Sequence, residues 1–345
     1  MEWFSEIDCL SPKVPPLHFG QKNRGKLKVG TKVFDGQFED LDKFVPNNLT
    51  RRQVTSKFSS LFDPMGKLIP ATSVMKVHLR KVVKDTWSWD DPIGYANRQL
   101  WIKNFWRIYN FQGMMFKRAV IPEDAADTKL HLIAAGDAAQ VKISGVWGRF
   151  LRKNGTYSCQ LMLGRSLLGN ENSTIAKEEL ESITVTSNLN WVVTNAMDGW
   201  DYDYILLSDS VIAICWVLSE DKRLSIFHRN RCNQVRMHTD VKKIMHVRSE
   251  YNPSDTGSRP DKVQDEDVGP DSAWEKGLPW MRESIEKAID NEILKPGTEI
   301  KLVGSEEDDF DKGCIIEKDI DVIVKGHSVQ ENRVYHWDKI GRAHV

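Results

Sequence analysis

The stretch Leu130–Ser210 constrains the fold more than any other part of the chain. It contains two short apolar runs that end in Asp137 and Asp209, with a helical pattern between them. This alternation of strand and helix patterns predicts an α/β fold. Open α/β sheets bind ligands beyond their strand ends, so both aspartates are candidate metal ligands for phosphate chemistry. Aspartates also begin ordinary turns after strands, and the stretch alone leaves both interpretations open.

Further patterns around this stretch predict a mixed five-stranded sheet with flanking helices. Lys153-Asn154-Gly155 separates two apolar runs and is a hairpin signal, so the strands on either side are expected to be antiparallel. The expected elements, in chain order, are strands at 130–137, 141–150 and 157–168, a helix at 171–197, a strand at 202–209, helices at 211–218 and 224–237, and a strand at 243–248.

The regions outside this α/β domain, which we place at residues 129–260, have different patterns. Residues 49–128 carry three helical patterns and predict a small helical subdomain. Residues 1–48 are interrupted by prolines and glycines and predict an irregular or β segment. Residues 261–345 contain acidic runs, and we expect a linker and a poorly defined tail with one short helix at 282–291.

Composition argues against several classes of protein. The 345 residues include 48 Lys plus Arg and 49 Asp plus Glu, so a nucleic-acid surface has to be a local patch. No apolar run approaches the ~20 residues of a membrane helix, and the N-terminus lacks the blocks of a signal peptide. The five cysteines have no paired spacing, which favours a reducing, intracellular compartment over a disulfide framework or a zinc module.

The helix expected at 171–197 offers three glutamates, and helical geometry selects one of them. Residues four apart share a helix face, and Glu179 lies four residues from both Ile175 and Ile183. Glu178 and Glu181 are expected to point further toward solvent. A carboxylate on an apolar face is costly unless a cation compensates it, so Glu179 is a third candidate ligand. The alternative is a glutamate at the edge of the apolar stripe.

A fourth carboxylate, Asp255, follows the last expected strand. It ends an Asn252-Pro253-Ser254-Asp255 turn and is followed by Thr256-Gly257. An Asn-Pro turn by itself needs no functional explanation, so this aspartate alone decides nothing.

Basic residues gather around the helix expected at 224–237 and form a candidate phosphate-binding patch. A solvated basic helix face is the alternative. The members of this candidate patch are Lys222, Arg223, Arg229, Arg231 and Arg236.

Four carboxylates in the order strand, helix, strand, turn resemble the Asp-Glu-Asp-Asp set of the ribonuclease H fold. The surrounding sequence is similar to BEL/Pao retrotransposons over about residues 1–281, in a region often described as Pao retrotransposon peptidase. The order of the blocks is more specific than any one of them. The blocks that carry the resemblance are Trp3 with Asp8-Cys9-Leu10, Leu49–Arg52, Phe62–Pro70, Trp89–Asp91, Ile175–Leu180, Ser208–Ser210, His228–Arg231 and Asn252–Arg259.

Two positions depart from the pattern of that family. Ala139 stands where the family usually has Ser, and Ala176 stands where it usually has Pro. Neither change removes a carboxylate, although a decayed copy of the element would drift in the same way.

The resemblance implies a reverse-transcriptase connection segment followed by a ribonuclease H domain. Asp137, Glu179, Asp209 and Asp255 take the four acidic positions as catalytic residues and ligands of Mg²⁺ or Mn²⁺, which prefer hard oxygen ligands. The expected activity is two-metal hydrolysis of the RNA strand of an RNA–DNA hybrid.

The same resemblance implies partners within a larger polyprotein. A polymerase palm is expected upstream and an integrase downstream, in the cytoplasm or in virus-like particles, with no membrane partner. The palm and its paired aspartates are absent from this sequence, so we do not expect DNA synthesis.

Two other functions stay open at this point. Asp255-Thr256-Gly257 spells the triplet of an aspartic peptidase, a class that needs two aspartates sharing a proton and therefore a homodimer here. The flanking sequence lacks the apolar strand and glycine-rich flap of that class. A catalytically inactive nucleic-acid-binding relic differs from the nuclease only in whether the four carboxylates converge.

Overall fold

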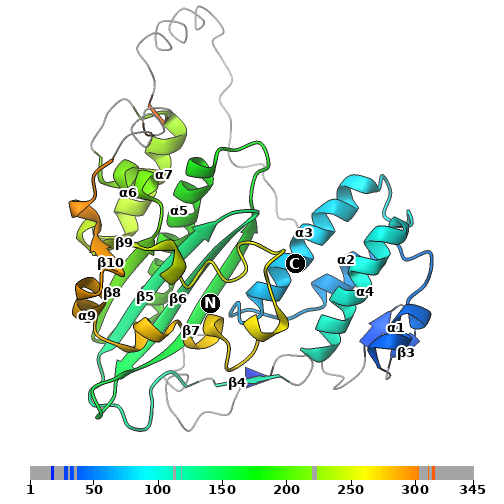
Figure 1. Cartoon of the computed structure of the whole chain (residues 1–345), viewed down its shortest axis with the longest axis horizontal. Helices are drawn as coiled ribbons and strands as arrows, with labels where there is room; N and C mark the ends of the chain where they lie inside the picture. Colours follow the sequence, from blue (N-terminus) through cyan, green and yellow to red (C-terminus); the bar gives the residue numbers. More distant parts are fainter. Residues whose placement is uncertain are drawn as a thin grey trace, which may run out of the picture.

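The computed structural model describes residues 17–18, 27–29, 32–34, 37–111, 114–117, 119–219, 224–302, 310 and 313–314. Within this part of the chain, a mixed sheet carries helices on both faces, and a helical subdomain projects from one side of it (Figure 1). None of the described helices is long and apolar enough to span a membrane.

The sheet has six strands in the order β10-β9-β8-β5-β6-β7. β8 runs parallel to both β5 and β9, and the remaining pairs are antiparallel. The strands are β5 (Leu130–Ala138), β6 (Val141–Leu151), β7 (Tyr157–Leu168), β8 (Tyr202–Ser208), β9 (Ile244–Val247) and β10 (Leu294–Pro296).

The predicted mixed α/β class is confirmed, and the predicted count of five strands is wrong by one. The sixth strand, β10, has three residues and ends in Pro296 at the edge of the sheet. Such a segment is too short to show a period, and proline is tolerated at a sheet edge because no ladder hydrogen bond is lost there.

Three helices cover one face of the sheet: α5 (Ile175–Ala196), α6 (Val211–Leu218) and α7 (Ile226–His238). The side chain of Thr174 caps α5 by accepting a hydrogen bond from the backbone N–H of Lys177. α5 lies close against β5 at Gly136, where an added Cβ would stand 2.2 Å from Oγ1 of Thr186. Glycine at this position therefore sets the distance between the helix and the sheet.

The helical subdomain precedes the sheet and has its own apolar core, which includes Leu41, Val54, Met75, Trp101 and Phe105. The three helices expected here are present as α2 (Arg51–Ser59), α3 (Ile69–Asp85) and α4 (Gly94–Asn110), and a further helix, α1 (Phe38–Phe44), lies before the predicted start of the subdomain at residue 49. α2 begins at a capping box formed by Thr50 and Gln53.

Four short strands lie near the beginning of the chain and around the end of this subdomain. β1 (Leu17–His18) pairs with β4 (Met115–Phe116), and β2 (Leu27–Val29) pairs with β3 (Lys32–Phe34). The rest of the segment before residue 37 lies outside the described residues.

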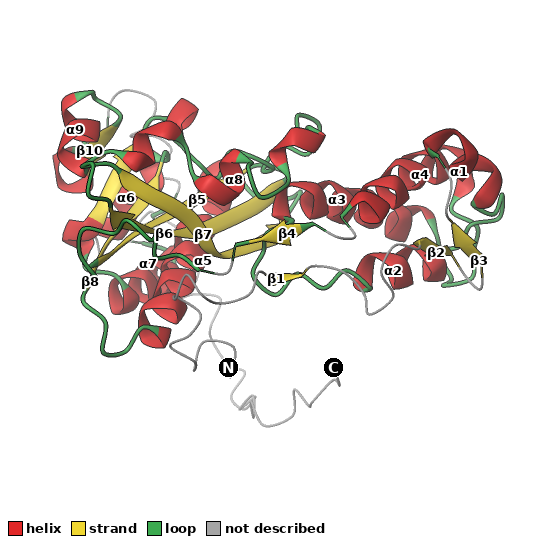
Figure 2. Cartoon of the chain, turned by 90° about the horizontal axis from the view of Figure 1, so that it is seen from below, coloured by secondary structure: helices red, strands yellow, loops and turns green. Residues whose placement is uncertain are grey.

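The expected acidic linker after residue 260 is folded against the sheet over residues 261–302, which corrects our prediction. α8 (Ala273–Lys276) and α9 (Ile285–Asp290) lie on the face opposite α5 and α7 (Figure 2). Trp274 and Trp280 are buried there, and the indole N–H of Trp147 donates to the carbonyl of Trp274. Acidic residues around these few tryptophans dominate the composition, so the sequence pattern resembles a linker.

Short 3₁₀ turns complete the described part of the chain. They are η2 (Val241–Lys243), η3 (Ser249–Tyr251), η4 (Asp265–Asp267), η5 (Pro279–Arg282) and η6 (Gly297–Glu299). The remainder of the expected tail, including residues 315–345, lies outside the described residues.

The helical subdomain is joined to the sheet through the turn before α3. Lys67 Nζ lies 2.8 Å from Oε1 of Glu275, and both side chains are buried. The indole N–H of Trp274 donates to the carbonyl of Gly66. Gly66 has φ +72°, and an added Cβ would lie 2.5 Å from the carbonyl oxygen of Gly164 in β7. Glycine is required here both by its backbone conformation and by the close approach of β7.

Gly66→Ala should therefore destabilise the protein by more than the cost of a positive φ. Gly155 is a matched control, because it has φ +81° but open space around its Cβ position. We expect Gly155→Ala to cost about 1–2 kcal/mol and Gly66→Ala clearly more in urea unfolding. Equal losses of unfolding free energy in the two variants would contradict the close packing of Gly66 against β7.

Candidate metal centre

Three of the four predicted carboxylates converge at one end of the sheet. One carboxylate oxygen from each of Asp137, Glu179 and Asp209 can be chosen so that all three lie within 4.8 Å of one another. The register of the parallel strands explains the pair of aspartates. Ala135 of β5 pairs with Leu207 of β8, and each aspartate follows two residues later.

Glu179 reaches the aspartates because α5 is held against the end of β5. The hydroxyl of Ser182, one turn further along α5, donates to the carbonyl of Asp137 at 3.1 Å. The backbone N–H of Ala138 lies near the Glu179 carboxylate and lowers its pKa in part. Together with the close approach at Gly136, these contacts place the glutamate over the strand end.

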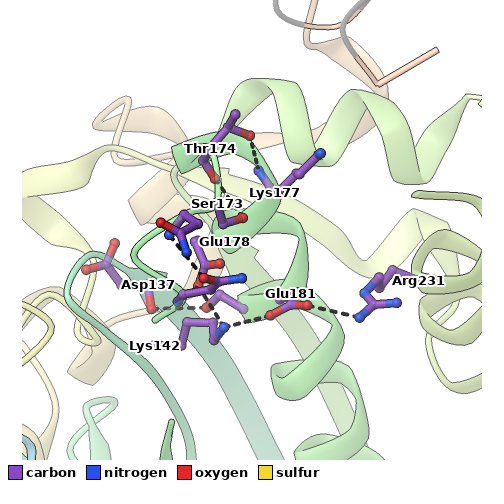
Figure 3. A network of polar contacts seen from close by, with 11 residues as sticks. Asp137, Lys142, Ser173, Thr174, Lys177, Glu178, Glu181 and Arg231 are labelled. Atoms are coloured by element: carbon purple, nitrogen blue, oxygen red, sulfur yellow. Dashed lines mark hydrogen bonds and ion pairs between the residues drawn. The ribbon is translucent and has the colours of Figure 1, made fainter. Parts of the chain in front are cut away.

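The neighbouring glutamates on α5 form a separate polar network, shown beside Asp137 in Figure 3. Lys142 Nζ lies 2.7 Å from Oε2 of Glu178 and 2.6 Å from Oε2 of Glu181. Glu181 Oε1 also accepts from Nη2 of Arg231 at 2.9 Å. Because Lys142 comes from β6 and Arg231 from α7, the network ties this part of α5 to both elements.

This network corrects our expectation that Glu178 and Glu181 point toward solvent. Glu178 is buried and Glu181 is partly buried, whereas Ile175, which we expected to face the core, is 79% exposed. We expected other elements to cover a single side of this helix. α5 is instead covered by the sheet and by α7, so Lys142 compensates carboxylates that solvent would otherwise have to stabilise.

Among the described residues, no cation forms an ion pair with a carboxylate of the centre, and the charge of Arg259 offsets the raised pKa values of Asp137 and Glu179 only in part. Oδ2 of Asp137 and Oε2 of Glu179 are buried without a hydrogen-bond partner. Burial, followed by repulsion from Asp137 and Asp209, raises the pKa of Glu179 to about 9. Burial also raises the pKa of Asp137 to about 6, with repulsion from Asp209 and Asp255 adding to the shift. Hard oxygens with excess negative charge fit a divalent cation such as Mg²⁺.

Asp255, the fourth predicted ligand, lies beside this cluster rather than within it. Its side chain is 43% exposed, and Oδ1 lies 3.5 Å from Nε of Arg259. Its charge nevertheless contributes to the raised pKa of Asp137, as a nearby carboxylate would.

Two other polar residues of the same turn reach the centre and were not singled out from the sequence. Nδ2 of Asn252, which is buried, donates to Oδ1 of Asp209 at 3.3 Å and to the carbonyl of Gly136 at 3.1 Å. The hydroxyl of Ser258 donates to the carbonyl of Asp255 at 3.3 Å, and the same side chain lowers the pKa of Asp137 in part. The Asn-Pro turn was a visible signal, but polar residues in turns are too common to identify their tertiary partners.

The candidate basic patch is largely engaged in contacts within the protein. Arg236 donates to the carbonyls of Val217 and Ser219 at the end of α6. Arg231 binds Glu181 and lies 3.9 Å from the ring centroid of Phe227. Nη2 of Arg229 donates to the carbonyl of Leu224. Lys222 and Arg223 lie outside the described residues, so the candidate patch as a whole stays a prediction.

We compared the sequence with models of known protein families. Residues 50–210 match the family model of the Pao retrotransposon-like RNaseH-like domain. These residues form a Pao-type retrotransposon polyprotein region. The Pao-type match begins at the N-cap of α2 and ends just after Asp209, so it spans three carboxylates of the centre but not Asp255. No curated protein matches the chain.

The raised pKa of Glu179 predicts how stability depends on pH when metal is removed. A carboxyl group whose pKa is higher in the folded state stabilises the fold at low pH, and this contribution is lost as pH rises toward about 9. In EDTA, we expect Glu179→Gln to increase the free energy of unfolding at pH 8 by a few kcal/mol, with little effect at pH 4.5. Urea unfolding at both pH values measures this difference.

Glu123→Gln, at an exposed glutamate, is the control for this experiment. Mg²⁺ should stabilise the wild-type protein at pH 8 through preferential binding to the folded state, and it should not stabilise Glu179→Gln. Parallel pH profiles for wild type and Glu179→Gln in EDTA would contradict the buried, uncompensated charge.

Proposed function

We propose that this Pao-type region hydrolyses the RNA strand of RNA–DNA hybrids with the help of divalent cations. The observation that carries the proposal is the convergence of Asp137, Glu179 and Asp209 in a sheet of RNase H-like topology. Buried carboxylates without a compensating cation destabilise a fold. Their presence at the strand ends is explained if they bind Mg²⁺ or Mn²⁺.

The chain supplies ligands and their supports for this chemistry. Asp137, Glu179 and Asp209 would hold the cation, and Asp255 is proposed as a fourth, more exposed carboxylate of the same centre. Bound Mg²⁺ would lower the pKa of water and offset negative charge on the phosphate. Asn252 orients Asp209 through its amide, and Ser182 fixes the strand end through the carbonyl of Asp137.

We propose a hybrid duplex as the substrate, bound through its backbone and independently of its base sequence. Proteins recognise A-form helices mainly by shape and by contacts to phosphates and 2′-hydroxyl groups. Cleavage restricted to the RNA strand would follow from the 2′-hydroxyl, which DNA lacks.

The aspartic-peptidase alternative receives less support from the structure. Asp255-Thr256-Gly257 lies in a turn region after η3. Gly257 packs against α3, because a Cβ added to Gly257 would lie 2.8 Å from Cα of Pro70. The carboxylate of Asp255 is paired with Arg259. That site class requires two aspartates that share a proton, whereas this aspartate is paired with a guanidinium.

Asp137→Asn should abolish cleavage of a hybrid labelled on its RNA strand. Loss of an outer-shell partner already costs about 10–100-fold in metal affinity or activity, so loss of this ligand should cost at least about 100-fold. Asp198→Asn, at an exposed residue beyond α5, should cleave like the wild type.

Gel analysis of cleavage with Mg²⁺, with Mn²⁺ and with EDTA tests the assignment. Equal activity in Asp137→Asn and the wild type would exclude this centre. A wild-type protein that binds the hybrid but leaves it intact under all three conditions would be the inactive relic. Pepstatin-sensitive cleavage of a peptide would instead support the peptidase.

A further inference from the structure

A second polar site lies where the helical subdomain meets the edge of the sheet. A pocket of about 300 Å³ opens between α2, the turn before α3, α3 itself and β7. Its polar lining includes two cations, Lys76 from α3 and Arg165 from β7, together with Ser166 and Thr72. Neither the proposed hydrolysis nor the core packing described above explains two cations in one pocket.

The cations of this pocket have no carboxylate partner of the kind that nearby cations on α3 have. Lys76, Arg80 and Lys84 are spaced four residues apart on α3, and both Arg80 and Lys84 pair with Glu171. Lys76 Nζ instead donates to neutral groups, the carbonyl and hydroxyl of Ser166, each at 2.7 Å. Among the residues that the structure describes, neither Lys76 nor Arg165 forms an ion pair.

The one carboxylate lining this pocket is already engaged. Both oxygens of Asp63 accept backbone N–H groups at the start of α3, from Lys67 and Leu68, at 2.8 Å each. Burial and repulsion from Arg165 lower the pKa of Lys76, and attraction to Asp63 offsets them only in part. An anion bound in this pocket would relieve the repulsion between the two cations.

The pocket has a fixed relation to the candidate metal centre. Ser166 pairs with Ile143, and Ile143 pairs with Asp137, so the three residues lie in register across β7, β6 and β5. Two strand spacings amount to about 10 Å. One strand of a duplex rises ~3.4 Å along the axis per base, so a duplex of a few base pairs is long enough to reach both sites.

Ile143 lies between the two sites in the register of the sheet and is tightly packed. An added Cβ on Gly257 would lie 2.8 Å from Cα of Pro70 and 3.1 Å from Cδ1 of Ile143. A free phosphate or a mononucleotide could occupy only one of the sites at a time. A nucleic-acid strand carries phosphates at regular spacing and could occupy both.

We propose that Lys76, Arg165 and Ser166 bind a backbone phosphate of the same duplex whose RNA strand is presented to Asp137, Glu179 and Asp209. This inference rests on the proposed function for its substrate. It assigns the helical subdomain a direct role in binding, with α3 contributing one cation and the sheet contributing the other.

Salt dependence of binding tests this pocket separately from catalysis. In an Asp137→Asn background, fluorescence anisotropy with a labelled hybrid should show weaker binding for Lys76→Gln and for Arg165→Gln. Each lost phosphate contact should reduce the salt slope by about 0.9, which makes the loss about fivefold at 0.15 M salt and negligible near 1 M. Lys76→Arg should largely restore binding.

The matched control is Lys81→Gln, which removes the same charge from an exposed position of the same helix. Because Lys76 also packs against Ser166, Arg165→Gln at an exposed residue keeps the test valid if Lys76→Gln lowers stability. Salt slopes of both pocket variants equal to that of Lys81→Gln would overturn the proposal. The proposal would also be overturned if Lys76→Gln and Arg165→Gln weakened the binding of inorganic phosphate or a mononucleotide but left the binding of the hybrid unchanged.

The outcome also separates this inference from the proposed function. A wild-type protein that fails to cleave the hybrid, but binds it with a slope that falls in both pocket variants, would retain the pocket and reject the nuclease. Normal cleavage with unchanged KM in Lys76→Gln and Arg165→Gln would retain the nuclease and reject the pocket.

Discussion

Electrostatic repulsion between buried carboxylates is the constraint on which the rest of this structure depends. Asp137 and Glu179 each bury an oxygen that has no hydrogen-bond partner, and Asp209 lies against them. Without a cation, such an arrangement destabilises the folded state and is relieved by protonation, as the raised pKa of Glu179 indicates. The surrounding elements must therefore be stable enough to hold the carboxylates together.

The supports of the centre come from different layers of the fold. Close contact between α5 and β5 at Gly136 fixes the distance between Glu179 and the strand ends. Lys142 then ties the flanking Glu178 and Glu181 to β6, and Arg231 ties Glu181 to α7. Residues far apart in the chain thus stabilise the carboxylates of α5. Glu178 and Glu181, which form ion pairs, lie directly beside Glu179, which does not.

Local patterns were sufficient to predict most of the elements that build this centre. The bounds of β7 and α6 agree with the predicted 157–168 and 211–218. The Lys153-Asn154-Gly155 turn precedes β7, and Ser210 caps the wholly apolar α6. The face of Glu179 was also predicted, although Ile175, one of the two residues used for the argument, is exposed. Ile183 one turn later is buried and fixes the same face.

Features that depend on tertiary partners could not be predicted in this way. The burial of Glu178 requires Lys142 from another strand, and the role of Asn252 requires the ends of β5 and β8 to lie beside its turn. The fold of residues 261–302 depends on Trp274 and Trp280 packing against the sheet. Arg236 is a residue type that often binds phosphate, yet its guanidinium donates to the carbonyl of Val217 at the end of α6. Each of these outcomes is set by a contact between distant segments.

The proposed nuclease activity depends on the binding of a divalent cation between the three carboxylates. Crystals soaked in Mn²⁺ and measured near its absorption edge should show an anomalous peak bounded by Asp137, Glu179 and Asp209. The same soak of Asp137→Asn should show a weaker peak or none. Wild-type crystals with ordered side chains and no anomalous peak at these carboxylates, in Mn²⁺ well above physiological levels, would contradict the proposed metal centre.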